Sequence, residues 1–311
     1  MKVTVIGHLC VDLIRHADGT ETRSPGGIFF SVAALANVLP ITDTIQPVFG
    51  VGKDEYDSII EQLQRYPNVD VSGIFRISGQ TNHVELLYKD SKERIECSRY
   101  IAEPIPFKKV KPYLETDMVL INMISGFDIS LETLDQIRME VREEHIPIYM
   151  DIHSLTLGIN DDFTRYHRPV EAWRRWLFMI HAVQMNEEEA AILTTEGFTE
   201  DGLARQILAL NTKAFIVTRG ERGCTAFIDT RKHIERHDIA GIPAGEQVDP
   251  TGCGDVFASA YCAHFMKSRD TIASLTFANQ IAARNAQLIG SGDIDVLASF
   301  RLEEIRQEQQ P

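Results

Sequence analysis

Short apolar segments alternate with helical segments along most of the sequence, and this alternation constrains the fold more than any other feature. Strands are predicted at residues 3–6, 46–51, 118–123, 147–151, 182–186 and 214–218. Helices are predicted at residues 27–39, 56–65, 131–144, 187–193 and 199–210. Strands that alternate with helices form βαβ units, whose strands lie parallel in one sheet. The sequence therefore predicts an α/β layered fold with a mainly parallel sheet.

Two segments interrupt this alternation. The first, at about residues 13–24, is polar and is predicted to be extended. The second, at about 81–101, has two strand-like halves around the turn Asp90-Ser91-Lys92, which is a hairpin pattern. We expect both segments to form a small β-strand lid, inserted within one domain that spans residues 1–311. The alternative is a plain surface hairpin with no role beyond structure.

Composition limits the classes of function. The formal net charge of −14 argues against a nucleic-acid binder, which needs clustered Lys and Arg, but it is compatible with a nucleotide site built from backbone N–H groups. The five cysteines show no C-x-x-C spacing, so we expect neither disulfides nor structural zinc, and a cytoplasmic protein. No uninterrupted apolar stretch reaches the roughly 18 residues of a membrane span.

The most informative motif is DPTGCGDVF at residues 249–257, where a loop enters a predicted helix. Glycines let the backbone approach a ligand closely, and the first N–H groups of a helix have no internal acceptor. Together with the helix dipole, they predict an anion pocket suited to phosphate. Asp255 beside this pocket is well placed to accept the proton of an attacking hydroxyl. The alternative is an ordinary helix start, because Asp also complements the dipole there and short glycine motifs are weak signals.

The whole motif resembles the C-terminal signature of the ribokinase-like (PfkB) family of sugar and nucleoside kinases, D-T-x-G-A-G-D-x-F. Pro250 and Cys253 replace the Thr and Ala of that pattern. The resemblance implies a ribokinase-like three-layer α/β fold with Asp255 as the catalytic base. It also implies that Asp249 lies beside the monovalent-cation site, for K⁺, that some members have. The anion hole would be formed by the backbone of Gly252, Cys253 and Gly254.

The resemblance extends to the N-terminal region. GHLCVD at residues 7–12 is similar to the first strand of the family, which implies that Asp12 binds substrate; a carboxylate accepts two hydroxyl protons in charge-assisted bonds. Gly26 and Gly27 resemble a glycine pair whose backbone approaches the substrate. Ser31 stands where the family often has Asn, so a shorter side chain is predicted at that substrate contact. Taken alone, Asp12 is equally typical of a turn, and the glycine pair of a helix start.

Further matches concern the magnesium ion. Asn186 and Glu189 match the N-x-x-E motif of the family, which implies that they hold Mg²⁺ through water. Three consecutive acids at a helix start are otherwise an ordinary complement to its dipole.

The nucleotide side has its own matches. VTRGERG at residues 217–223 resembles the turn near the nucleotide, which implies that Thr218, Gly220 and Gly223 bind it, although a strand-to-strand hairpin has the same pattern. Arg219 and Arg222 are candidates to neutralise its phosphates. The segment around Asn279 resembles the helix beside the adenine in the family, which implies that Asn279 faces the base; the alternative is a polar position on a helix.

Absent motifs narrow the choice further. The sequence has no G-x-x-x-x-G-K-[ST], no G-x-S-x-G and no H-E-x-x-H, which excludes P-loop kinases, α/β-hydrolases of that motif and that class of zinc enzymes. We therefore predict an ATP- and Mg²⁺-dependent kinase that phosphorylates a hydroxyl of a small sugar-like substrate, with a homodimer contact through the exposed strand edge of the lid. A nucleoside or a vitamin-like alcohol is the alternative substrate. A non-catalytic sugar or nucleotide sensor on the same fold is the alternative from another class.

Overall fold

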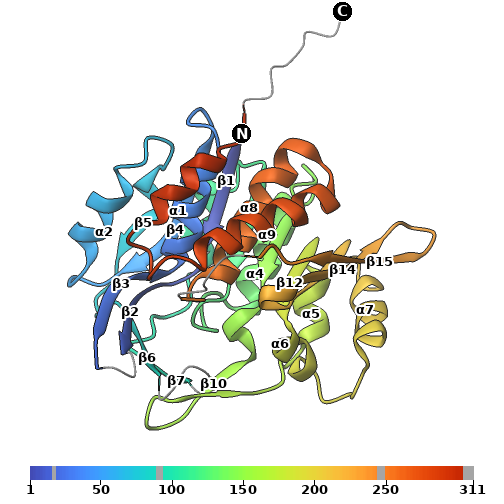
Figure 1. The fold of residues 1–311 in the computed structure, drawn as a ribbon, viewed down its shortest axis with the longest axis horizontal. Helices are drawn as coiled ribbons and strands as arrows, with labels where there is room; N and C mark the ends of the chain where they lie inside the picture. The colour runs from blue at the N-terminus through green and yellow to red at the C-terminus, as the bar shows by residue number, and fades with distance from the viewer. Residues whose placement is uncertain (16–18, 89–93, 244–248, 304–311) are drawn as a thin grey trace, which may run out of the picture.

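The computed structural model describes residues 1–15, 19–88, 94–243 and 249–303, and its centre is a large, mainly parallel sheet (Figure 1). Within these residues the sheet has nine strands. In spatial order they are β15 (Ile234–Ala240), β14 (Gly223–Asp229), β13 (Ala214–Thr218), β12 (Ala182–Asn186), β9 (Ile148–Asp151), β8 (Met118–Asn122), β1 (Lys2–Ile6), β4 (Thr44–Val51) and β5 (Ile74–Arg76). Neighbouring strands from β13 to β5 are parallel, and β14 and β15 extend the sheet antiparallel.

The central strands are apolar because both of their faces are covered. All five residues of β8 are buried, as are the last four residues of β1. Continuous apolar strands are typical of parallel sheets that have helices on both sides. By contrast, β15 alternates between exposed and half-buried residues, as expected for an edge strand.

Helices cover both faces of the sheet and complete the three layers. They are α1 (Ile28–Val38), α2 (Tyr56–Leu63), α3 (Phe107–Val110), α4 (Leu131–Val141), α5 (Trp173–Phe178), α6 (Glu187–Ile192), α7 (Glu200–Leu208), α8 (Cys253–Ser268) and α9 (Thr271–Asn285). From β1 to β4 the chain moves one way across the sheet, and from β8 through β13 it moves the other way. Right-handed crossovers therefore place α1 on one face and α4, α5 and α7 on the opposite face. Helix α8 packs against α1 and α9, so these three share a face (Figure 1).

The two segments that interrupt the alternation form a separate small sheet, as predicted. Its strands are, in order, β3 (Glu21–Gly27), β2 (Leu9–Arg15), β6 (Asn82–Tyr88) and β7 (Arg94–Arg99). The first segment is longer than the predicted 13–24, because β2 begins only two residues after β1. The predicted turn at Asp90-Ser91-Lys92 lies outside the described residues.

A second hairpin, which the sequence did not predict, lies beside this small sheet. It consists of β10 (Leu157–Ile159) and β11 (Arg165–His167). The Ser98 N–H in β7 donates to the carbonyl of Phe163 in the turn of this hairpin, at 2.9 Å. The two structures are therefore joined along the outer edge of β7.

The predicted α/β fold is confirmed, and each predicted strand and helix has a counterpart at nearly the same residues. The strand-to-strand hairpin considered as the alternative for residues 217–223 is present as the antiparallel pair β13–β14, and the sequence missed β15, which extends the sheet further. No helix among the described residues combines the length and the apolar character needed to cross a membrane.

Candidate active site

A polar cavity of about 230 Å³ lies where the carboxyl ends of the parallel strands meet the small sheet and the start of α8. Strands β1 and β8 are neighbours from which the chain winds in opposite directions, and ligands of open α/β sheets bind at such a switch point. Backbones approach closely here, because a Cβ on Gly7 would lie 2.5 Å from the carbonyl oxygen of Asn122. The cavity contains many of the predicted site residues: Asp12, Gly27, Asn186, Glu189, Thr218, Gly252, Gly254 and Asp255.

Asp255 lies in the first turn of α8, half-buried in the cavity wall. The Asn122 side-chain amide at the end of β8 donates a hydrogen bond to its Oδ1 atom, at 3.1 Å. Removal from water raises the pKa of Asp255 to about 7, although the positive charge of His153 and the bond from Asn122 oppose that rise. A carboxylate with a pKa near neutral pH is well matched to general-base chemistry.

The loop before α8 supplies fewer anion donors than predicted. Gly252 has φ +75°, and a Cβ there would overlap the ring of Phe30, so only glycine fits. The Cys253 N–H donates to the Pro250 carbonyl at 3.2 Å, and no cavity-lining atom comes from Cys253. Among the described residues, the N–H groups of Gly254 and Asp255 have no backbone acceptor. The Asp255 N–H is directed at its own carboxylate, so the Gly254 N–H is the donor that remains for an anion.

Asp12 lies on the opposite side of the cavity, in β2, and is almost fully buried. Its carboxylate covers Gly26 of the neighbouring strand β3, where a Cβ would overlap it. Desolvation raises the pKa of Asp12 to about 7 despite a hydrogen bond from the Cys10 thiol at 3.2 Å, and repulsion by Asp255 adds to the rise. The predicted Gly26 thus makes room for Asp12 rather than lining the cavity itself.

Ser31 does not line the cavity. It lies in α1 with no exposed surface, and its hydroxyl accepts a hydrogen bond from the Asn122 side-chain amide at 2.5 Å. The predicted substrate contact is therefore replaced by a contact with another protein side chain.

Asn186 and Glu189 line the cavity together and also cap α6. The Asn186 side chain accepts from the Glu189 N–H at 2.8 Å, and the Glu189 carboxylate accepts from the Asn186 N–H at 2.7 Å. This capping box realises the structural alternative considered for the motif. The second carboxylate oxygen of Glu189 lies 3.3 Å from Nδ1 of His153.

His153 is a site residue that the sequence did not reveal. It has φ +29°, follows β9 and lines the cavity with Asp151. Desolvation lowers the pKa of His153, but the hydrogen bond to Glu189 and the charges of Glu189 and Asp151 outweigh it and raise the pKa to about 10. Burial and the charge of Glu189 in turn raise the pKa of Asp151. The imidazolium of His153 is thus a positive charge among carboxylates.

Gln184 fixes the relation between the sheet and the start of α8. Its amide nitrogen contacts an Asp151 carboxylate oxygen at 3.0 Å and the Gly254 carbonyl at 3.1 Å. Its amide oxygen accepts from the Tyr149 hydroxyl at 2.7 Å. A signal for these missed residues was present in the sequence, because Asn122, Asp151 and Gln184 are polar residues inside or at the end of apolar strands.

The remaining predicted nucleotide residues lie outside the cavity. Gly220 and Gly223 flank a short 3₁₀ turn after β13. The Asn279 amide of α9 lies 3.5 Å and 3.3 Å from the carbonyl oxygens of Ile239 and Ala240, and so joins α9 to β15. Of this group only Thr218 reaches the cavity.

Asp249 also lies outside the cavity and is buried. Its carboxylate oxygens accept the N–H groups of Thr251 at 2.9 Å and Gly290 at 3.1 Å. It therefore joins the loop before α8 to the loop after α9.

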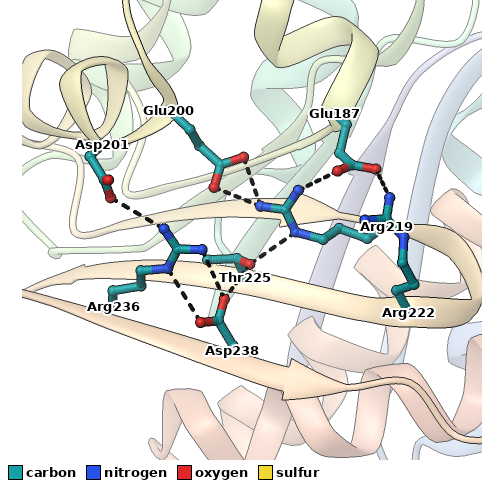
Figure 2. Close-up of polar contacts among 8 residues, drawn as sticks. All are labelled: Glu187, Glu200, Asp201, Arg219, Arg222, Thr225, Arg236 and Asp238. Carbon is teal, nitrogen blue, oxygen red and sulfur yellow. Dashed lines mark hydrogen bonds and ion pairs between the residues drawn. The ribbon is translucent and has the colours of Figure 1, made fainter.

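Arg219 and Arg222 pair with carboxylates in a network at the end of the sheet (Figure 2). Arg219 contacts Glu187 of α6 and binds both oxygens of Glu200 of α7 at 2.6 Å and 2.7 Å, and Arg222 also contacts Glu187. This network includes a second arginine cluster in which Arg236 contacts Asp201 and Asp238. The guanidinium groups of Arg219 and Arg222 are thus directed at carboxylates in this structure.

A helix start with an open N–H donor, facing carboxylates at the switch point of a parallel sheet, suits a phosphotransferase that acts on hydroxyl groups. Residues 1–296 match the pfkB family carbohydrate kinases, and the chain belongs to this family. The predicted family is thereby confirmed.

Relatives and solved structures agree with this assignment. A cytidine kinase of Thermococcus kodakarensis is 25% identical over 277 residues, which cover 86% of this chain and 90% of the relative. A pyrophosphate-dependent kinase in the ribokinase family shares the fold with a TM-score of 0.78 at 17% identity, over 96% of this chain and all of the other. An E. coli chain described as a ribokinase II, in complex with ATP and Mg²⁺, has a TM-score of 0.72 at 18% identity, over 96% and 98%.

Proposed function

We propose that this chain transfers the γ-phosphate of ATP to a hydroxyl group of a small sugar-like acceptor, with Asp255 as the general base. One observation carries the proposal. Asp255 lies at the N-terminus of α8, beside the open N–H group of Gly254, and shares its cavity with the acceptor-side carboxylate of Asp12. The first of these features suits a phosphoryl group, and the second suits a polyol.

In the proposed reaction, Asp12 accepts hydrogen bonds from two hydroxyls of the acceptor molecule. These bonds orient a third hydroxyl, which is the one to be phosphorylated, toward Asp255. The acceptor oxygen bonds to the γ-phosphorus as its proton passes to the Asp255 carboxylate, and the bond to the leaving ADP breaks. The N–H group of Gly254 stabilises charge on the transferred group. Catalysis of this kind depends mainly on positioning and electrostatics.

The donor side suits a magnesium ion. Glu189, Asp151 and Asn186 present oxygen atoms to one cavity, and the Glu189 carboxylate keeps lone pairs beyond those used in the capping box. Such a site fits Mg²⁺, because this ion keeps several waters and needs few protein ligands. When bound, Mg²⁺ would offset the charge of the donor phosphates.

The surroundings of Asp249 suit a monovalent cation such as K⁺. The side-chain oxygens of Thr251 and Asn285 are buried without a hydrogen-bond partner in the described part of the chain. Asn285 contacts the Thr251 carbonyl at 3.2 Å, so these oxygens belong to one neighbourhood. Residues 251–253 connect this neighbourhood to the anion site, which gives the cation a route to affect the loop before α8.

We further propose that the small sheet acts as the lid of a single domain. Val84 and Leu86 of β6 and Glu96 of β7 line the cavity opposite α8. Closure would exclude water from the transferred phosphoryl group. The proposed homodimer contact falls on β3, since the described part of the sheet ends at this strand and the other edge is joined to the β10–β11 hairpin.

A nucleoside acceptor is the second candidate substrate. It is favoured by the match to the cytidine kinase, which extends over most of both chains. Its sugar ring would offer the hydroxyl, and its base would need space beyond Val84 and Leu86.

Pyrophosphate is the second candidate donor. Asn279, predicted to face the adenine, lies against the carbonyls of Ile239 and Ala240 instead. A donor without a base would not need that side chain.

The test measures phosphoryl transfer from Mg-ATP and, separately, from Mg-pyrophosphate to free sugars, sugar acids, sugar phosphates, polyols and nucleosides. We expect ATP to support turnover with one acceptor class. Asp255→Asn should lower kcat between about 10²- and 10⁴-fold while the fold is kept, because the base is lost. Near-normal turnover by the variant would remove Asp255 from the mechanism.

Two other outcomes point elsewhere. Turnover with pyrophosphate alone would replace the donor. Tight binding of ATP and one acceptor without turnover would favour a sensor.

A further inference from the structure

Asn122 connects the proposed base to the core of the protein. Its side-chain amide nitrogen contacts Ser31 Oγ in α1 at 2.5 Å and Asp255 Oδ1 in α8 at 3.1 Å. Asn122 and Ser31 have no exposed surface, and neither lines the cavity. Asn122 therefore reaches Asp255 from behind, from the end of β8, and leaves the cavity side of the carboxylate open.

The chemistry of Asp255 fixes the orientation of this amide. An NH₂ group has two donors, and here one is directed at each oxygen acceptor. The reverse orientation would place the Asn122 amide oxygen against the carboxylate of Asp255. In the orientation found, that amide oxygen is buried without a partner in the described chain, so the site keeps an unsatisfied acceptor and retains the donor to Asp255.

The packing of α1 and α8 holds this arrangement in place. Ser259, one turn after Asp255 in α8, donates its hydroxyl to the Ser31 carbonyl at 3.1 Å. The hydroxyl oxygen of Ser31 is thus bonded to Asn122 of β8, and its carbonyl oxygen is bonded to Ser259 of α8. Ser31, where the resemblance predicted a substrate contact, becomes part of the support for the base.

We propose that Asn122 is a positioning residue for phosphoryl transfer: held by Ser31, it fixes the carboxylate of Asp255 and keeps it ionised. This role rests on the proposed function of Asp255 as the base. A hydrogen bond donated to a carboxylate favours its charged form, which is the form that accepts a proton. Other groups also act on this carboxylate: His153 favours the charged form, whereas Asp128 and, through mutual repulsion, Asp12 oppose it.

The first experiment follows kcat and KM against pH for Asn122→Leu, which keeps the volume and removes the donor. Loss of the donor should raise the pKa of Asp255, so the acid limb of kcat should move upward by about one pH unit. At pH 6 this corresponds to a loss of roughly tenfold, with the KM of the acceptor nearly unchanged. Ser31→Ala, which loosens Asn122 but keeps the donor, should give a smaller shift in the same direction.

Asn68→Leu is the matched control. Asn68 is also a buried Asn that contacts α1, through the Ala36 carbonyl at 3.1 Å, and it also has a buried side-chain oxygen without a partner in the described chain. It should lose stability without any shift of the acid limb. An equal pH profile for Asn122→Leu and Asn68→Leu would overturn the positioning role.

A double variant separates this proposal from the one about the base. If Asn122 acts through Asp255, adding Asn122→Leu to Asp255→Asn should change the residual turnover less than twofold. A further loss of tenfold would overturn the role, because Asn122 would then act on something else. Full activity of Asp255→Asn alone would instead refute the proposed base. Should Asn122→Leu fail to fold, the pH profile of Ser31→Ala, compared with that of Asn68→Leu, gives the same decision.

Discussion

Carboxylates in the cavity and carboxylates in the arginine network at the end of the sheet have opposite surroundings and opposite pKa shifts. In the cavity, Asp12 is almost fully buried, its donor among the described residues is the Cys10 thiol, and the pKa of its carboxyl rises to about 7. In the network, Asp238 is exposed, and hydrogen bonds from Thr225 and Arg236 lower its pKa (Figure 2). Carboxylates paired with arginines support the structure, whereas carboxylates left without a strong partner remain able to bind ligands and take up protons.

The difference indicates that the cavity carboxylates lower the stability of the folded protein. Burying a carboxylate without a cation is unfavourable, and perturbed pKa values of this kind concentrate at functional sites. The arginine network, in contrast, adds no group to the cavity lining. Perturbing each region in turn sharpens the contrast.

The largest effect is expected from Gly26→Ala. The added methyl group would overlap the Asp12 carboxylate, which would have to leave its present position in the cavity wall. We expect kcat/KM to fall on the order of 100-fold and the free energy of unfolding to fall by about 1–3 kcal/mol.

Gly79→Ala is the control for this change. A Cβ at Gly79 would meet no atom within 4 Å, so steady-state kinetics and thermal unfolding should match the unaltered protein. If Gly26→Ala were equally silent, the assignment of Asp12 to the acceptor would lose its steric support.

A smaller effect, of opposite sign for stability, is expected from Asp12→Asn. The pKa of Asp12 is about 7 in the folded state and near its ordinary value of 3.8 in the unfolded state, so stability falls as pH rises from about 4 to about 7. Removing the charge should raise the free energy of unfolding at pH 8 by on the order of 2 kcal/mol, with little change at pH 4. Chemical denaturation at the two pH values checks this, and a pH-independent difference would contradict it.

The smallest effects belong to the network. Arg219 is mostly covered and bonds to two carboxylates, so Arg219→Gln should lower the free energy of unfolding by about 1–2 kcal/mol. Arg236 is about half exposed, and Arg236→Gln should change the free energy of unfolding by less than about 0.5 kcal/mol. Neither variant should shift the acid limb of kcat. Such a shift would show that the two regions are electrostatically coupled.

The sequence predicted the parallel sheet and the position of Asp255 because both depend on local patterns. Short continuous apolar runs indicate strands, and glycines before an apolar helix mark its start. The sequence could not predict which side chains face the cavity. Ser31, Cys253 and Asn279 all occupy motif positions, yet each is directed at another part of the protein through contacts that only tertiary packing creates.

The missed residues follow the same principle. Asn122 ends β8 and His153 follows β9, and both come near Asp255 only after the sheet has assembled. A polar residue at the end of an apolar strand marks Asn122 as unusual, but its sequence neighbours do not show that it would contact Asp255. The β10–β11 hairpin was missed because its strands are too short to produce a periodic signal.

The β2–β3 half of the small sheet leaves the main domain and rejoins it at one point. The N–H of Ile28 donates to the carbonyl of His8 at 3.1 Å, so the hairpin of β2 and β3 begins and ends at a single pair of bonded residues. Gly27, with φ +58°, lies at that junction. In the proposed closure of the lid, this hairpin would turn about that narrow junction together with β6, to which β2 is bonded. Asp12 lies on this hairpin, and Ser31 lies in the first turn of α1, directly after the junction. Closure of the lid would therefore move the acceptor-binding carboxylate and the residue that supports the base at the same time.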